Sequence, residues 1–124
     1  MEKQFFKLGH YGNIEIKKPL SLGVCFEFTS LWASELDQAQ LARLCAGAIC
    51  ACSEDSKLPL YRPEKTNVLE FGFKAMERIL GAGVFPNQIF EIGSVALLVM
   101  AQALPTEPEV EEAVNFTTEA KEAD

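Results

Sequence analysis

Residues 86–104, PNQIFEIGSVALLVMAQAL, constrain the fold more than any other part of the chain. Between Ile92 and Ala101 there is no charged residue and no side-chain amide, and the polar positions nearby do not form a continuous hydrophilic face. A helix that is apolar nearly all round is normally buried by its own domain or by a partner. The segment is too short and too interrupted for a membrane span, which needs about 20 predominantly apolar residues. We therefore predict a central helix here, with the rest of the chain packed around it and no membrane as partner.

Length and charge narrow the class of protein. The 124 residues suit a single domain, and a hydrophobic content of 48% is enough for a core without disulfide or metal staples. Residues 1–104 have 11 acidic and 10 basic residues, whereas residues 105–124 have seven acidic residues and Lys121 as their one base. No basic stripe along the sequence would neutralise phosphates, which argues against nucleic-acid binding. The first residues do not resemble a signal peptide, so we expect a cytoplasmic protein with reduced cysteines.

The N-terminal third contains two segments with less definite patterns. Residues 5–8 and 13–17 predict a short β-hairpin around a Gly-His-Tyr-Gly turn, and an irregular N-terminal arm is the alternative. Residues 19–32 predict a helix, with an alternating strand as the alternative for the same segment. The helix would bury one face, made of Leu20, Val24, Phe28 and Leu31.

Three further helices have clearer signals. In residues 34–52, Asp37 and Gln40 form a capping-box pattern, and many small residues would let a neighbouring helix approach closely. In residues 67–81, an asparagine cap is followed by a glutamate three residues later, and a glycine after the helix would end it in the left-handed conformation. The short link to residues 88–104 predicts an antiparallel pair of these last two helices. The fold class is therefore mainly α: a small helical bundle with a short N-terminal hairpin or arm.

The domain organisation follows from these patterns. Residues 1–104 form a single helical domain, with the hairpin or arm at residues 1–18. After Pro105 the sequence becomes acidic and poor in large apolar residues, which predicts a flexible, disordered tail over residues 105–124.

The cysteines and the single histidine do not predict a reaction centre. On a helix, Cys50 would point about 140° away from Cys45, and Cys45 and Cys52 would lie roughly 10 Å apart along the axis. No Cys-x-x-Cys pair occurs, and His10 is remote in sequence with no nucleophile or carboxylate placed to orient it. We predict that the cysteines are small buried hydrophobic residues, and we assign no catalytic residue, no metal ligand and no cofactor.

Two segments are candidates for contacts with a partner. Leu60 and Tyr61 lie in a Pro-bounded loop that either forms an apolar contact patch or closes over the bundle. In the tail, Val110, Val114 and Phe116 would form a short motif that folds on binding. The tail is otherwise a solubilising segment, or a shield for an apolar groove until a partner arrives.

The segments DQAQLARLCAGAIC, LPLYRP and NVLEFGFKAMERILGAGV, followed by the charged tail, resemble the tail-assembly chaperones of tailed phages. The resemblance is architectural and covers about residues 19–124, without a diagnostic motif. It implies a non-enzymatic, oligomeric assembly factor that coats an apolar helical partner, such as a tape-measure protein, in the host cytoplasm. We therefore predict a protein-binding assembly factor. The alternative is a small ligand- or metal-binding regulator that uses its cysteines.

Overall fold

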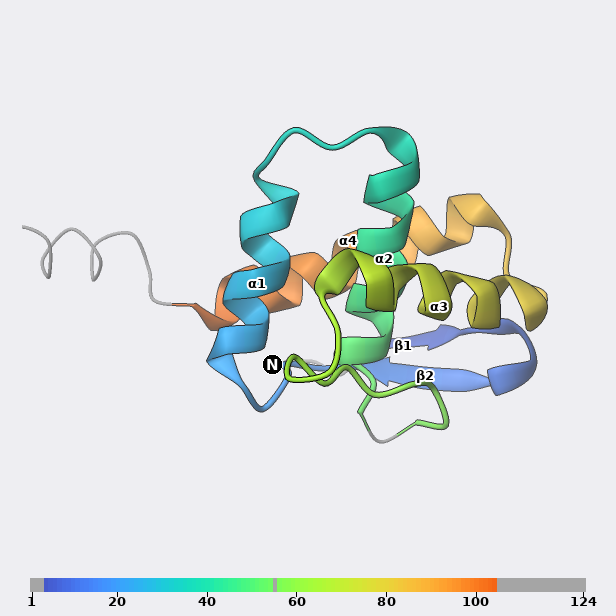
Figure 1. Ribbon diagram of the computed structural model, residues 1–124. Helices are drawn as coiled ribbons and strands as arrows, with labels where there is room; N and C mark the ends of the chain where they lie inside the picture. Colours follow the sequence, from blue (N-terminus) through green and yellow to red (C-terminus); the bar gives the residue numbers. More distant parts are fainter. Residues whose placement is uncertain (1–3, 55, 105–124) are drawn as a thin grey trace, which may run out of the picture.

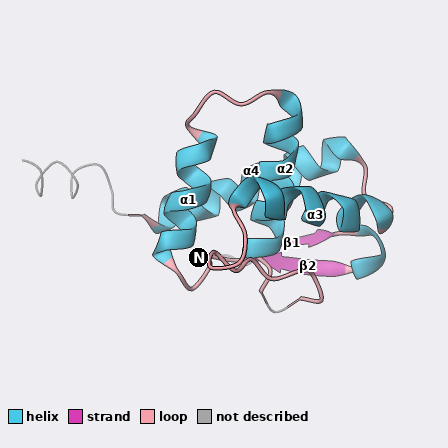
Figure 2. Ribbon diagram, in the orientation of Figure 1, coloured by secondary structure: helices cyan, strands magenta, loops and turns pink. Residues whose placement is uncertain are grey.

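The computed structural model describes residues 4–54 and 56–104, and within these ranges the chain is mainly helical. Its elements in chain order are β1 (Gln4–Lys7), a 3-10 turn (Gly9–Tyr11), β2 (Asn13–Ile16), α1 (Leu22–Trp32), α2 (Gln38–Ala51), α3 (Val68–Gly81) and α4 (Pro86–Ala103). Figure 1 shows the four helices packed together with the hairpin along one side, and Figure 2 shows the long loop that joins α2 to α3. The predicted fold class, a small helical bundle with an N-terminal hairpin, is confirmed. None of the described helices has the length and apolarity needed to cross a membrane.

The central helix is α2, which corrects the prediction that residues 86–104 hold this place. Every residue from 44 to 53 is buried, and α2 packs against both α3 and α4, which lie on opposite sides of it (Figure 1). By contrast, α4 exposes a stripe with helical spacing, made of Glu91, Ser94, Leu98 and Ala101. The reason is side-chain size: alanines and glycine at positions 46–48 and 51 let neighbouring helices come close to α2 from several directions.

Glycines set the closest approaches between the helices. A Cβ atom on Gly93 of α4 would lie 2.3 Å from the Cβ atom of Cys45 on α2. A Cβ atom on Gly72 of α3 would lie 2.1 Å from the carbonyl oxygen of Arg43, also on α2. Both neighbours therefore cross α2 at a residue without a side chain, and contacts at this distance leave no room for one.

The predicted helix starts are confirmed. The backbone N–H of Gln40 donates to Oδ1 of Asp37 at 2.8 Å, and Oε1 of Gln40 accepts from the backbone N–H of Asp37 at 3.1 Å, which completes the capping box of α2. At the start of α3, the backbone N–H of Glu70 donates to Oδ1 of Asn67 at 2.9 Å. These bonds satisfy N–H groups that have no partner inside the helix.

The end of α3 is set by Gly83, whose φ of +92° is in the left-handed region. The N–H of Val84 donates to the carbonyl of Ile79 at 3.3 Å and that of Gly83 to the carbonyl of Leu80 at 3.1 Å, which together form a Schellman motif. The turn leads into α4, but the predicted antiparallel pairing of α3 with α4 is wrong. The two helices have little direct contact, because α2 lies between them.

The helix predicted over residues 19–32 is confirmed as α1, but it begins later than expected. Ser21 caps it through Oγ, which accepts from the backbone N–H of Val24 at 3.4 Å. Val24 and Phe28 are buried as predicted. Leu20 precedes the helix and is 92% exposed, so its predicted place on the buried face is wrong.

The N-terminal hairpin is antiparallel, with Phe6 opposite Ile14 and Gln4 opposite Ile16. Ile14 and Ile16 are buried, and alternation along β2 directs them toward the bundle. Two backbone hydrogen bonds, each 2.9 Å long, attach the hairpin to helix ends: the N–H of His10 donates to the carbonyl of Ala82, and the N–H of Lys17 donates to the carbonyl of Cys52. The hairpin is thus fixed at its turn to α3 and at its far end to α2.

Candidate functional site

Tyr61 fixes the loop between α2 and α3 to the helices. Its hydroxyl donates a hydrogen bond to Oε2 of Glu27 on α1 at 2.5 Å. Its ring packs edge-on against Phe28, with centroids 5.4 Å apart, and lies at a tilt to Phe71 at 5.1 Å. Burial, followed by the hydrogen bond to the Glu27 carboxylate, raises the pKa of Tyr61. Tyr61, one of the predicted contact residues, therefore holds the loop in place, and it is partly buried there.

A groove of about 510 Å³ opens between this loop and α3. It is lined by Pro59, Leu60, Arg62, Lys65, Thr66, Phe71, Lys74, Glu77 and Arg78. Leu60, the other predicted contact residue of the loop, is 49% exposed and lies at this groove. Phe71 is buried and contributes to the groove from within the core. The apolar part of the groove is therefore built from two loop residues, Pro59 and Leu60, and one core residue, Phe71.

Four cations line the groove together with this apolar part, and we call the whole site the basic groove. Arg62 and Lys65 come from the loop, and Lys74 and Arg78 come from successive turns of α3. Glu77 is the one carboxylate in the lining. Within the part of the chain that the structure describes, none of the four cations has an ion-pair partner. The groove therefore offers uncompensated positive charge beside an exposed leucine.

Helix geometry explains why the groove residues of α3 lie together. Phe71, Lys74 and Arg78 are spaced by three and four residues, so they share one face of α3. The aromatic ring of Phe71 reaches Tyr61, which brings the loop and its two cations to the same face. Sequence reasoning did not identify the four cations, because they are not a run of basic residues. The usable signal was the i, i+4 spacing of Lys74 and Arg78 on a predicted helix.

The tail residues predicted as contacts, Val110, Val114 and Phe116, lie outside the described residues, so their prediction stays a prediction. Other large apolar side chains are exposed over several elements: Phe5, Leu22, Phe26, Phe73, Leu80, Phe85 and Leu98. Of these, Phe73 is covered in part by the Arg43 guanidinium, whose central carbon lies 5.1 Å from the ring centroid. The remaining ones come from different elements and do not line the basic groove.

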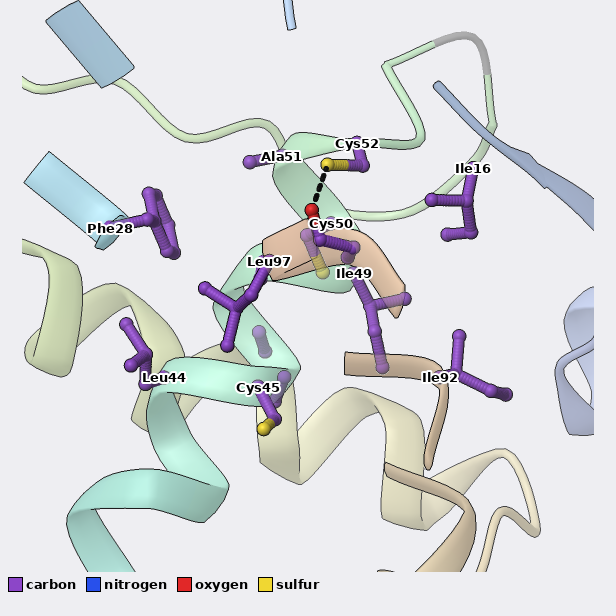
Figure 3. Close-up of a cluster of buried hydrophobic side chains, with 14 of the residues drawn as sticks. Ile16, Phe28, Leu44, Cys45, Ile49, Cys50, Ala51, Cys52, Ile92 and Leu97 are labelled. Atoms are coloured by element: carbon purple, nitrogen blue, oxygen red, sulfur yellow. Dashed lines mark hydrogen bonds between the residues drawn. The ribbon is translucent and has the colours of Figure 1, made fainter. Parts of the chain in front are cut away.

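The cysteines lie inside the core, as predicted. Figure 3 shows Cys45, Cys50 and Cys52 among aliphatic side chains of α2 and α4, and Cys25 on α1 is also buried. The thiol of Cys52 donates to the carbonyl oxygen of Ala96 at 3.5 Å. Burial raises the pKa of all four thiols, in Cys45 to about 11 and in Cys50 to about 12. Thiols of this kind are protonated at neutral pH and are poor nucleophiles and metal ligands.

Potential metal and acid–base groups do not gather elsewhere in the described ranges. No group of three or more His, Cys, Asp or Glu side chains within residues 4–54 and 56–104 is arranged to hold a metal ion. His10 is exposed in the hairpin turn, near Gly83. The basic groove is therefore the candidate site that the described residues support.

Comparisons of the chain with protein-family models, with curated proteins and with solved structures give no match. The resemblance to tail-assembly chaperones therefore has no support from known proteins and stays a prediction. Function has to be inferred from the groove and from the charge distribution of this chain.

Proposed function

We propose that the protein is a non-enzymatic protein-binding factor and that the basic groove holds an acidic, amphipathic segment of its partner. The single observation that carries this proposal is that four cations without an ion-pair partner among the described residues line the same groove as the exposed Leu60. An amphipathic helix binds a groove through apolar anchors on one face, and flanking carboxylates would pair with the surrounding cations. Leu60 would contact the anchor, and Tyr61 would keep the loop in the binding position.

Net charge favours a protein over a nucleic acid as partner. The chain has a net charge of −7, and such a charge repels a long polyanion more strongly than a short segment with a few carboxylates. The lining also lacks an exposed aromatic ring for base stacking, because Phe71 is buried. A short segment that is acidic on one face and apolar on the other could contact both the cations and the apolar part of the groove.

The sharpest form of the proposal is an assembly chaperone of the phage tail-assembly type. Such a factor would cover an apolar helical partner, such as a tape-measure protein, in the cytoplasm of the host until assembly. It would act as an oligomer, and the exposed apolar side chains outside the groove would contribute to contacts between subunits. No chemical step is required of any residue.

The test is fluorescence anisotropy of the full chain with a labelled amphipathic helical peptide that has glutamates on its polar face. A second peptide with lysines in place of the glutamates is the charge control. We expect the acidic peptide to bind, and the double variant Lys74→Glu with Arg78→Glu to weaken binding at least about tenfold, since two attractions become repulsions. A matched variant, Lys7→Glu with Lys57→Glu, makes the same change in net charge at exposed lysines outside the groove and is expected to bind as the wild type does.

Three results would overturn the proposal. The first is absence of binding by the acidic peptide, and the second is equal weakening by the groove variant and the matched variant. The third is tighter binding of a single-stranded oligonucleotide than of the acidic peptide at the same salt concentration, which would assign the groove to nucleic acid.

A further inference from the structure

We propose that the basic groove is occupied, in the absence of a partner, by residues 105–124 of the same chain. This inference rests on the proposed function, because it names a ligand for the same groove. Residues 105–124 have seven acidic residues and one lysine, and the groove has four cations and one carboxylate. The acidic tail and the basic groove are therefore complementary in charge.

The order of residues in the tail also fits the groove, because acidic residues stand next to apolar ones. Four glutamates occur between positions 107 and 112, and they are followed by Val114 and Phe116. The groove is lined by these four cations and by the apolar side chains of Pro59, Leu60 and Phe71. A segment with glutamates next to a valine and a phenylalanine supplies both kinds of contact at once. Phe116 is the one aromatic residue after Phe90, which makes it the natural apolar anchor.

The length of the tail allows it to reach the groove within one molecule. The α4 helix ends at Ala103, and the 20 residues of the tail span up to roughly 66 Å when extended. A body of about 100 residues has a radius of gyration of about 13 Å, so its far side lies within that reach. Phe116 is 12 residues beyond Leu104, which allows it roughly 40 Å.

Covalent linkage makes even a weak interaction effective. A segment joined to its binding site by a short flexible linker has an effective concentration in the millimolar range. A groove with a millimolar intrinsic affinity for the tail would therefore be occupied about half of the time in every molecule. A partner segment then has to displace the tail, and neutralising the tail glutamates is expected to increase the affinity of the groove for the acidic peptide.

The experiment uses the full chain with a nitroxide spin label at Thr118→Cys, isotope labelling of the backbone nitrogens and NMR detection. The four native cysteines are buried with raised pKa values, so the label attaches to the new thiol. We expect paramagnetic broadening of the amide signals of Leu60, Lys74 and Arg78 at low protein concentration. Lys74→Glu with Arg78→Glu is expected to remove this broadening, and Lys7→Glu with Lys57→Glu is expected to retain it.

A mixed sample distinguishes the same chain from a second copy. Spin-labelled chains without isotope are added to isotope-labelled chains without a spin label, and broadening in this sample reports contact between molecules. Broadening seen only between molecules, or no broadening at the groove, would overturn the inference. Peptide binding without tail contact would leave the proposed function standing, whereas tail contact without peptide binding would overturn the proposed function instead.

Discussion

The crossing of α2 and α4 at Gly93 gives a quantitative prediction for Gly93→Ala. The added methyl carbon would lie 2.3 Å from Cβ and 2.7 Å from Cα of Cys45. Carbon atoms pack at about 3.5–4.0 Å, so the two helices would have to separate by roughly 1.2–1.7 Å at this point. A gap of about 0.5–1 Å already loses a quarter to a half of the contact energy of the atoms that face it.

The expected loss of stability can be estimated from the core side chains of α4. Its large core side chains are Ile89, Ile92, Leu97 and Met100. Burial of each stabilises the fold by about 1.5–3 kcal/mol, so loss of a quarter to a half of this total costs about 1.5–6 kcal/mol. Replacing glycine by alanine in a helix raises the free energy of unfolding by about 1 kcal/mol, because alanine has the higher helix propensity. We therefore expect Gly93→Ala to lower the free energy of unfolding by about 2 kcal/mol, which agrees with measured costs of overpacking.

The assay is urea unfolding followed by circular dichroism at 222 nm, with thermal unfolding as a second measurement. A loss of about 2 kcal/mol corresponds to a decrease in Tm of roughly 8–16 °C for a domain of this size. The matched control is Gly81→Ala at the end of α3, where an added Cβ meets nothing within 4 Å and the change is expected to stabilise by about 0.5–1 kcal/mol. A Gly93→Ala protein as stable as the wild type would refute the close crossing of α2 and α4.

Three further predictions test other parts of the structure. Asp37→Ala removes the cap of α2 and is expected to cost about 1 kcal/mol in urea unfolding, whereas no loss would contradict the capping box. Tyr61→Phe removes the hydrogen bond to Glu27 and is expected to cost about 1 kcal/mol at pH 7. Because folding raises the pKa of Tyr61, its contribution is present below the unfolded pKa of about 10 and is lost as pH rises through the higher folded pKa, so a difference from Tyr61→Phe that stays constant to high pH would contradict it. The thiols of Cys45 and Cys50 are expected to be unreactive toward a disulfide reagent at pH 8 until the protein is unfolded, and rapid labelling of the native protein would contradict their burial.

Local signals were sufficient to predict most elements of this fold. Each of these signals depends on a few neighbouring residues, and each is present in the structure: the caps at Asp37 and Asn67 and the left-handed glycine after α3. These features depend on short-range hydrogen bonds, which is why the sequence alone identifies them.

The arrangement of the helices was harder to predict, because it depends on side-chain size more than on hydrophobicity. The most apolar stretch, residues 86–104, indicated a central helix there, yet the small residues of α2 allow its neighbours to surround it. The short link between α3 and α4 indicated a direct pair, but both pack against α2 at Gly72 and Gly93. The basic groove was missed for a related reason, since its cations come from two segments that only the packing of Tyr61 brings together.

The attachment of the hairpin affects the order in which the chain can fold during synthesis. The hairpin is synthesised before α2 and α3, but the carbonyl groups that accept its hydrogen bonds belong to Cys52 and Ala82 at the ends of those helices. Until residue 82 has emerged, the apolar side chains of Leu8, Ile14 and Ile16 have no complete surface to cover them. An isolated two-stranded hairpin is only marginally stable in water, so the hairpin cannot become stable before these helices are made. It therefore reaches its native position only after α2 and α3 have been synthesised.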